Sequence, residues 1–153
     1  MRYHDLPDRY SKCSENLQKG GSFKIRAATF KILSHLDEIE GKGVIAASVG
    51  NHAQVWPWPP APSVPATIIM PVWAKLTKQL ATRGYGAQLI LEGQSLVESI
   101  SVGQQMAAET GKTFIHLYDD EEVITGQGTI GLVIMEDLPE ADHILVPVLL
   151  FCY

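Results

Sequence analysis

Short runs of Val, Ile, Leu and Ala that alternate with stretches of helical spacing constrain the fold more than any other feature of this chain. Such runs are typical of buried strands. Strands that alternate with helices pair in parallel and are joined by crossovers. We therefore predict an α/β fold, a three-layer, mostly parallel sheet with flanking helices. Its strands are expected at Val44–Ala47, Ala66–Met70, Gln88–Leu91, Thr113–Ile115 and 143–148.

The segments between these runs carry the start and stop signals of helices. Ser22 precedes an apolar stripe that predicts a helix over 22–39. Serine or aspartate followed three residues later by glutamate is a capping box, and glycine or proline ends a helix. The other helices are expected after Ser95 with Glu98, ending at Gly111; after Asp119 with Glu122, ending at Pro139; and around Leu76 and Leu80, ending at Gly84.

Residues 55–65 interrupt this alternation. The segment holds five prolines in eleven residues, where a crossover helix would be expected. Proline lacks an amide donor and clashes with the preceding helical turn. We predict an extended, polyproline-like loop; the alternative is a proline-rich interaction motif.

Charge and cysteine content exclude several classes of protein. The net charge is −5, so no basic face is available for nucleic acid. No stretch is long and apolar enough to cross a bilayer, and we expect a cytoplasmic protein. Cys13 and Cys152 lie near opposite ends, and the five histidines are scattered. Free thiols are expected, with no disulfide framework and no metal site.

The segment 15–26 holds the first candidate for chemistry, Lys24. It follows Gly20-Gly21-Ser22-Phe23 and falls in the first turn of the expected helix, where the positive end of the helix dipole opposes an ammonium. A neutral amine is what Schiff-base formation with an aldehyde requires. The alternative is an ordinary solvated surface lysine.

A second candidate is the turn 48–54, which follows a predicted parallel strand. Ligands of open α/β sheets bind beyond the carboxyl ends of the strands. Ser48, Asn51 and backbone N–H groups there can receive a carboxylate. The alternative is a polar turn capped by Asn51. A dinucleotide site is disfavoured because the chain has no G-x-G-x-x-G at this turn.

The acidic run 118–122, followed by glycines at 126 and 128, is the third feature. Paired carboxylates could bind a metal or carry protons. We favour a structural role, with first-turn acids that complement the helix dipole and glycines that allow close helix packing.

Taken together, the motifs resemble the threonine dehydratase and serine racemase branch of the fold-type II pyridoxal-phosphate enzymes, whose fold is tryptophan synthase beta-like. The resemblance covers most of residues 15–148. The matching segments are Glu-Asn-Leu-Gln-Lys-Gly-Gly-Ser-Phe-Lys-Ile-Arg at 15–26, Ser-Val-Gly-Asn-His-Ala-Gln at 48–54, Ala-Thr-Ile-Ile-Met-Pro at 66–71, the run 78–86 and Gly-Gln-Gly-Thr-Ile-Gly at 126–131.

This resemblance implies pyridoxal 5′-phosphate as cofactor and a role for each matching residue. Lys24 would bond covalently to the cofactor and remove the substrate α-proton, and Phe23 would pack near the cofactor ring. Asn51 would bind the ring hydroxyl, and Ser48, Asn51 and His52 would hold the substrate carboxylate. The implied reaction is β-elimination of water from L-threonine or L-serine, which yields a 2-oxo acid and ammonia, as in isoleucine biosynthesis. The resemblance also implies a homo-oligomer.

The resemblance further implies a division of the chain. Residues 1–40 would belong to a large domain, 41–140 to a small α/β domain, and 141–153 to the start of a large-domain strand. The bulky residues 149–153 stand where a glycine-rich phosphate loop is expected. We therefore expect a truncated chain that is inactive alone, with frame slips producing residues 55–63 and 149–153. The alternative is a non-catalytic α/β fragment or binding module without cofactor.

Overall fold

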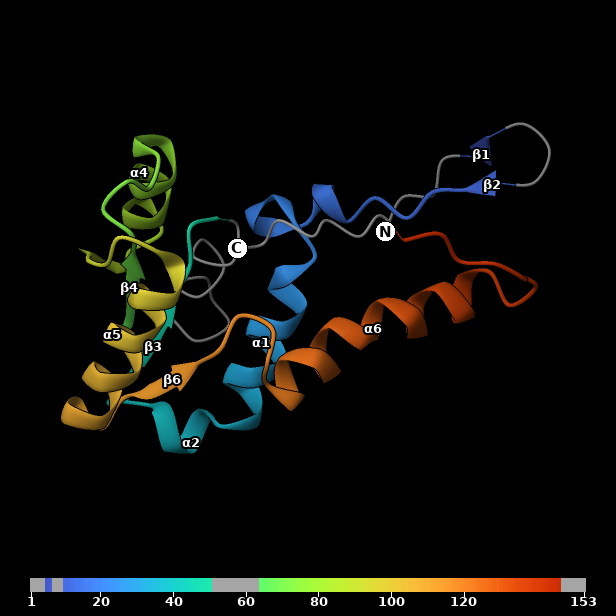
Figure 1. The fold of residues 1–153 in the computed structure, drawn as a ribbon. Coiled ribbons are helices and arrows are strands. Elements are labelled where there is room, and N and C mark those ends of the chain that lie inside the picture. Colours follow the sequence, from blue (N-terminus) through green and yellow to red (C-terminus); the bar gives the residue numbers. More distant parts are fainter. Residues whose placement is uncertain (1–4, 7–9, 51–63, 147–153) are drawn as a thin grey trace.

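A four-stranded parallel sheet forms the centre of the fold. We describe a computed structural model of the chain, which covers residues 5, 6, 10–50 and 64–146. The strand order is β5-β4-β3-β6 (Figure 1). The strands are β3 (Val44–Ala47), β4 (Ala66–Met70), β5 (Gln88–Leu91) and β6 (Thr113–Ile115), so four of the five predicted strands are confirmed. Val44 of β3 pairs with Ala66 of β4 on one side and with Thr113 of β6 on the other.

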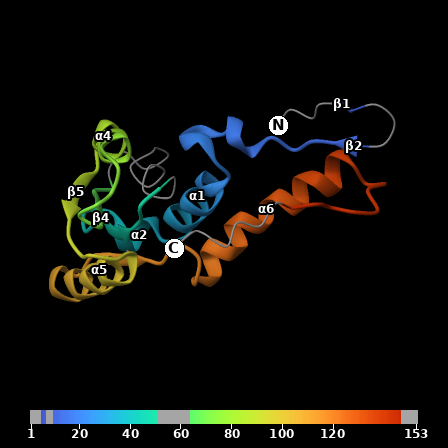
Figure 2. The ribbon, with the colours of Figure 1, turned by 45° about the horizontal axis from the view of Figure 1, so that its top comes forward.

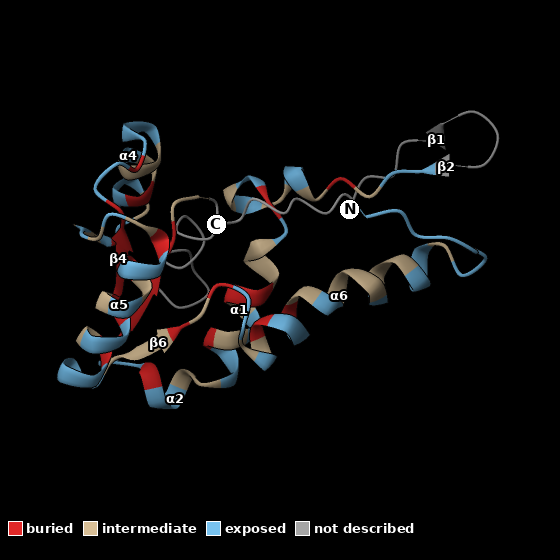
Figure 3. Ribbon diagram, in the orientation of Figure 1, coloured by how far each residue is buried: buried red, intermediate tan, exposed pale blue. Residues whose placement is uncertain are grey.

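Helices cover both faces of this sheet, which confirms the three-layer prediction (Figure 2). Successive side chains of a strand point to opposite faces. Val44 and Ala46 therefore pack with α1 (Lys24–Ser34) and α2 (Leu36–Ile39), while Ile45 and Ala47 pack with α5 (Leu96–Thr110). β3 and β4 are buried along their whole length, as Figure 3 shows by colour.

The predicted helix over 22–39 is two helices. His35 separates α1 from α2 with a non-helical backbone, φ −125° and ψ 23°. Its N–H bonds to the carbonyl of Ile32, three residues back, which tightens the last turn of α1. The chain then turns into α2 and reaches β3 through Gly43, whose φ is +91°. A side chain at Gly43 would meet the Pro65 carbonyl oxygen at 2.4 Å.

Capping signals were accurate at α5 and off by one residue at the next helix. Ser95 accepts a hydrogen bond from the Glu98 N–H at 3.1 Å, and Gly111 ends α5 in the left-handed conformation. The next helix, α6 (Glu121–Asp137), is capped by Asp120 rather than by the predicted Asp119. The Asp120 carboxylate accepts the N–H groups of Glu122 and Val123, an arrangement that the adjacent Asp119 does not share. The predicted short helix is α4 (Leu76–Gly84).

One predicted strand is wrong where the structure can test it. Residues 143–146 form no strand, and Leu145 is 88% exposed. A strand needs a neighbouring backbone to pair with, and among the described residues 143–146 pair with none. Residues 147–148 and the expected phosphate-loop region lie outside the described residues. The proline-rich segment up to residue 63 also lies outside the described residues.

A short antiparallel pair, β1 (Asp5–Leu6) with β2 (Tyr10–Ser11), was not predicted.

Candidate functional site

Lys24 is the first residue of α1 and so lies in the first turn of the helix, as the sequence predicted. Gly20 and Gly21 both have positive φ, +74° and +71°, and turn the chain into the helix. The Lys24 ammonium lies 5.1 Å from the centre of the Phe23 ring, within the range of a cation–π contact. Phe23 itself is 39% exposed, so its ring presents a flat apolar face at the helix start.

The sequence predicted that Ser22 would cap α1, and this prediction is wrong. Its side chain is buried, yet its hydroxyl has no hydrogen-bond partner among the described residues. The first turn of α1 is closed by the backbone instead, through a bond from the Arg26 N–H to the Phe23 carbonyl at 3.0 Å. A buried hydroxyl without a partner costs free energy, so the Ser22 hydroxyl is available to a group that enters this end of the helix.

The turn after β3 lies beside the start of α1 in both Figure 1 and Figure 2. Ser48 is buried there, and its N–H bonds to the Ile69 carbonyl at 3.0 Å. The Ser48 hydroxyl accepts the Gly50 N–H at 3.2 Å, so the turn is folded back on itself. Asn51 and His52, the other predicted residues of this turn, lie outside the described residues.

A hydrogen-bonded ion pair fixes the segment that leads to Lys24. The Arg26 guanidinium donates to both Glu15 carboxylate oxygens, at 2.9 and 3.0 Å, and to the Thr129 hydroxyl of α6 at 3.1 Å. Hydrogen bonding from Arg26 lowers the pKa of Glu15, while burial and the neighbouring Glu15 raise the pKa of the Cys13 thiol. Glu15 and Arg26 lie within the motif 15–26, but no sequence signal predicts their partner Thr129.

The acidic residues at the start of α6 form a separate cluster with α1. Lys31 bonds to Asp120 and Glu122, and His35 Nε2 lies 2.6 Å from a Glu122 oxygen. Hydrogen bonds to Glu122 raise the pKa of His35, and those from Lys31 and His35 lower the pKa of Glu122. Burial alone would lower the pKa of Lys31, but its carboxylate partners outweigh burial and raise it.

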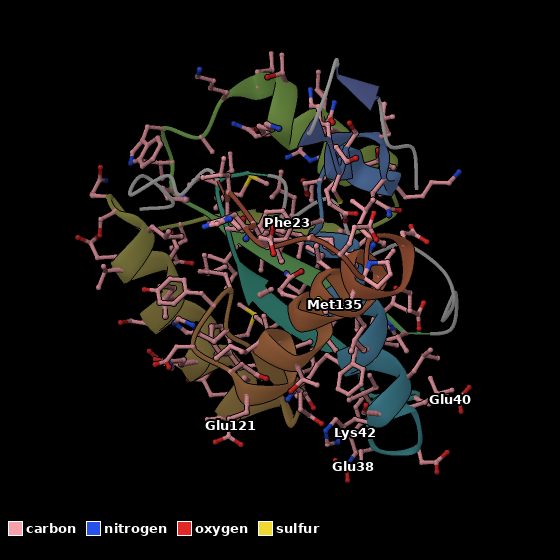
Figure 4. The ribbon with its side chains drawn as sticks, turned by 90° about the vertical axis from the view of Figure 1, so that its right-hand side faces the viewer. Phe23, Glu38, Glu40, Lys42, Glu121 and Met135 are labelled. Carbon is pink, nitrogen blue, oxygen red and sulfur yellow. The ribbon has the colours of Figure 1, made fainter. Side chains whose placement is uncertain are left out.

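This cluster is remote from Lys24. Lys24 begins α1 and His35 follows its last residue, a separation of about 16 Å along a helix axis. In Figure 4, the charged residues Glu38, Glu40 and Lys42, which lie on and just after α2, are at the bottom of the view, well below Phe23. In the described part of the chain no group of three His, Cys, Asp or Glu side chains is arranged to hold a metal ion. The acidic run therefore acts as helix cap and ion-pair partner.

The residues at the start of α1 fit an aldehyde cofactor with a flat ring. An amine supplies the nucleophile for the aldehyde, and the neighbouring aromatic face suits a planar ring. The Ser22 hydroxyl adds an uncommitted donor. The start of α1, which carries these residues, lies beside the turn that follows β3 (Figures 1 and 2), and open α/β sheets bind their ligands at the carboxyl ends of such strands.

Fold and candidate site together define a parallel α/β domain with a lysine at the start of the helix α1, which packs on the central sheet. The family model described as pyridoxal-phosphate dependent enzyme matches residues 9–149. The chain belongs to this family.

Curated relatives in the family include lyases of threonine. The chain is 53% identical over 136 residues to an L-threonine ammonia-lyase of Thermotoga maritima, covering 88% of this chain and 34% of the relative. It is 47% identical over 135 residues to the L-threonine dehydratase catabolic TdcB of Staphylococcus aureus, covering 88% of this chain and 39% of the relative. The chain thus spans between a third and two fifths of the length of these relatives.

Solved structures agree with the fold. Maize serine racemase superposes with a TM-score of 0.78 at 37% identity, covering 86% of this chain and 40% of that chain. A threonine deaminase isoform of Solanum lycopersicum superposes with a TM-score of 0.73 at 34% identity, covering 84% of this chain and 36% of that chain. No helix in the described part of the chain is sufficiently long and apolar for a membrane span.

Proposed function

We propose that this chain carries the lysine-bearing part of a pyridoxal-phosphate-dependent ammonia-lyase that acts on L-threonine or L-serine. The observation that carries the proposal is the position of Lys24, at the start of α1 and beside the turn that ends β3. The reaction would eliminate the β-hydroxyl as water, and hydrolysis of the product would release ammonia and leave a 2-oxo acid.

In this proposal the residues at the start of α1 and in the turn after β3 divide the work of binding and proton transfer. The cofactor, when bound, supplies an electron sink that makes the substrate α-proton acidic. Lys24 Nζ holds the cofactor aldehyde and later accepts that proton. The Phe23 ring packs against the cofactor ring, and the Ser48 turn holds the substrate carboxylate. From the family resemblance, we propose that Asn51 binds the ring hydroxyl of the cofactor and that Asn51 and His52 help Ser48 to hold the substrate carboxylate.

Cofactor titration with site mapping tests the proposal. Pyridoxal 5′-phosphate is added to the chain, the visible absorbance is recorded, and the bond is trapped with borohydride before peptide mass spectrometry. We expect one modified lysine, Lys24, and loss of saturable colour in Lys24→Ala. The matched control is Lys42→Ala, at an exposed lysine far from Phe23 (Figure 4), which should take up cofactor like the parent chain.

Equal modification of several lysines, unchanged by Lys24→Ala, would contradict the proposal. A chain that unfolds cooperatively but takes up no cofactor would favour the second reading, a non-catalytic α/β fragment or binding module.

The finer features of the enzyme also remain proposals. We propose L-threonine or L-serine as substrate and a homo-oligomeric assembly from the family resemblance, and a cytoplasmic location from the composition. The related Staphylococcus aureus enzyme is named catabolic, so we propose amino-acid metabolism as the setting and retain isoleucine biosynthesis as an expectation of the resemblance.

A further inference from the structure

The side chains of Lys24 and Arg26 leave α1 on opposite sides. Residues two apart in a helix are separated by about 200° around its axis, whereas residues three or four apart share a side. Lys24 therefore shares its side with Ala27 and Ala28, which are 0% and 1% exposed. Both alanines belong to the buried cluster that contains Ala46 of β3. The Lys24 amine is thus carried by the interior side of α1, and the Arg26 guanidinium by the outer side.

The Arg26 guanidinium ties three segments of the chain together. Two of its N–H groups donate to the two carboxylate oxygens of Glu15, at 2.9 and 3.0 Å, and a third donates to the Thr129 hydroxyl of α6 at 3.1 Å. The planar guanidinium matches a carboxylate in this paired arrangement, which fixes direction as well as distance. The side chains of Arg26 and Glu15 are 15% and 13% exposed, so solvent and salt screen the pair only weakly.

The partner of Arg26 on α6 is itself held in place. The Thr129 hydroxyl donates to the Gly126 carbonyl at 2.8 Å, and its oxygen accepts from Arg26. Gly126 lies where α6 approaches the backbone of α1, since a side chain there would meet the Ala27 Cα at 2.6 Å. The outer side of the first turn of α1 is thus fixed against a closely packed helix.

The pair of Glu15 and Arg26 also closes the loop that leads to Lys24. The two residues are eleven apart in the sequence. The loop between them contains Gly20 and Gly21, both with positive φ, and glycine restricts the backbone less than any other residue. The backbone of this loop does not by itself determine how the first turn of α1 is rotated, and the ion pair supplies that restraint.

A second ion-pair network joins the other end of α1 to α6. Lys31 contacts Asp120 and Glu122, and His35 contacts Glu122. Lys31 is seven residues after Lys24, a distance of about 10 Å along a helix axis. Helix ends fray when their own first turn is not held, so a network this far away stabilises the two helices without fixing that turn.

We propose that Arg26, held by Glu15 and Thr129, is a positioning residue that fixes the rotation of the first turn of α1 and thereby directs the Lys24 amine to the interior side, toward the turn after β3. This inference rests on the proposed function, in which that amine holds the cofactor aldehyde. The network around Lys31 stabilises the same two helices and has no part in directing the amine.

The first experiment reads the position of the Lys24 amine without any cofactor. The lysines of the full chain are dimethylated with ¹³C-formaldehyde and a borohydride, and Lys24→Arg identifies the Lys24 signal in the carbon–proton NMR spectrum. The centre of the Phe23 ring lies 5.1 Å from Lys24 Nζ, so the ring should displace this signal in the parent chain, and Phe23→Leu should abolish the displacement. We expect Glu15→Gln and Arg26→Gln to abolish it as well.

The matched control is Glu122→Gln, which removes a carboxylate from the second network between the same two helices. It should leave the Lys24 signal at its position in the parent chain. Urea midpoints verify that each variant is folded. A Lys24 signal that Phe23→Leu, Glu15→Gln or Arg26→Gln does not move overturns the proposal, and so does an equal movement in Glu122→Gln.

Thr129 provides a milder pair of variants for the case in which Glu15→Gln or Arg26→Gln does not fold. Thr129→Ser keeps the hydroxyl that accepts from Arg26 and should keep the displaced Lys24 signal. Thr129→Val has a similar shape without the hydroxyl and should reduce the displacement. The same signal position in both variants overturns the proposal.

The second experiment separates this inference from the proposed function. Pyridoxal 5′-phosphate is trapped on the chain with borohydride, and peptide mass spectrometry gives the ratio of label on Lys24 to label on the exposed Lys42. We expect this ratio to fall about tenfold in Arg26→Gln and to keep its parent value in Glu122→Gln. A parent chain that does not prefer Lys24 contradicts the proposed function, and the formaldehyde experiment then still decides whether Arg26 positions the amine. A preference for Lys24 that persists in Arg26→Gln overturns the positioning role.

Discussion

Close packing between α1 and α6 depends on the absence of a single side chain, at Gly126. An added Cβ would lie 2.6 Å from the Ala27 Cα, 2.9 Å from the Phe30 Cβ and 3.1 Å from the Arg26 carbonyl oxygen. Two of these three atoms belong to the backbone of α1, so no side-chain rotation can relieve the clash. Gly126→Ala should therefore push the two helices apart.

The magnitude follows from two opposing effects. Alanine in a helix interior is favoured over glycine by about 1 kcal/mol. Overpacking a well-filled contact costs about 1–3 kcal/mol. Gly128→Ala offers a matched control, because it lies in the same helix and an added Cβ there meets nothing within 4 Å. The helix-propensity gain cancels between the two variants, so Gly126→Ala should be less stable than Gly128→Ala by about 1–3 kcal/mol.

Urea denaturation followed by far-UV circular dichroism measures this difference. We expect Gly128→Ala to unfold at a higher urea concentration than the parent chain and Gly126→Ala at a lower one than Gly128→Ala, with similar slopes. Equal midpoints for the two variants would refute the reasoning, because they would show that α1 and α6 do not touch at Gly126.

Other substitutions test the caps and the ion-pair cluster. Asp120→Ala should lower the free energy of unfolding by about 0.5–2 kcal/mol, because it removes the acceptor for the Glu122 and Val123 N–H groups. Asp119→Ala should change it by less than about 0.5 kcal/mol. A larger loss in Asp119→Ala than in Asp120→Ala would show that Asp119 is the cap. Ser95→Ala should cost about 1 kcal/mol in urea denaturation, and an unchanged midpoint would mean that the cap is made by another group. The raised pKa of His35 means that its contact with Glu122 stabilises the fold fully below about pH 6.5 and is lost as pH rises through the folded pKa. The parent chain should therefore lose about 0.2–1 kcal/mol as the pH rises from about 6.5 through the folded pKa, and His35→Gln should not. Parallel pH profiles for both proteins would contradict the contact.

The sequence alone determined the elements whose physical cause is local. The strands Val44–Ala47 and Ala66–Met70 were predicted to the residue, because a short apolar run rich in β-branched residues is typical of a buried strand. The same holds for the capping box at Ser95, whose partners lie within three residues. Placement of Lys24 at the start of a helix was predicted from two glycines, from Ser22 as a cap and from the apolar stripe; the position was correct, although Ser22 does not cap the helix.

Tertiary structure decided whatever depends on residues far apart in the sequence. The contact of His35 with Glu122, the bond from Lys31 to Asp120 and the bond from Arg26 to Thr129 all arise where α1 meets α6, about ninety or a hundred residues further along the chain. No local pattern marks such meetings, because hydrogen-bond partners are chosen by packing. For the same reason the apolar run at 143–146 forms no strand: apolar composition permits a strand, but only a neighbouring backbone makes one.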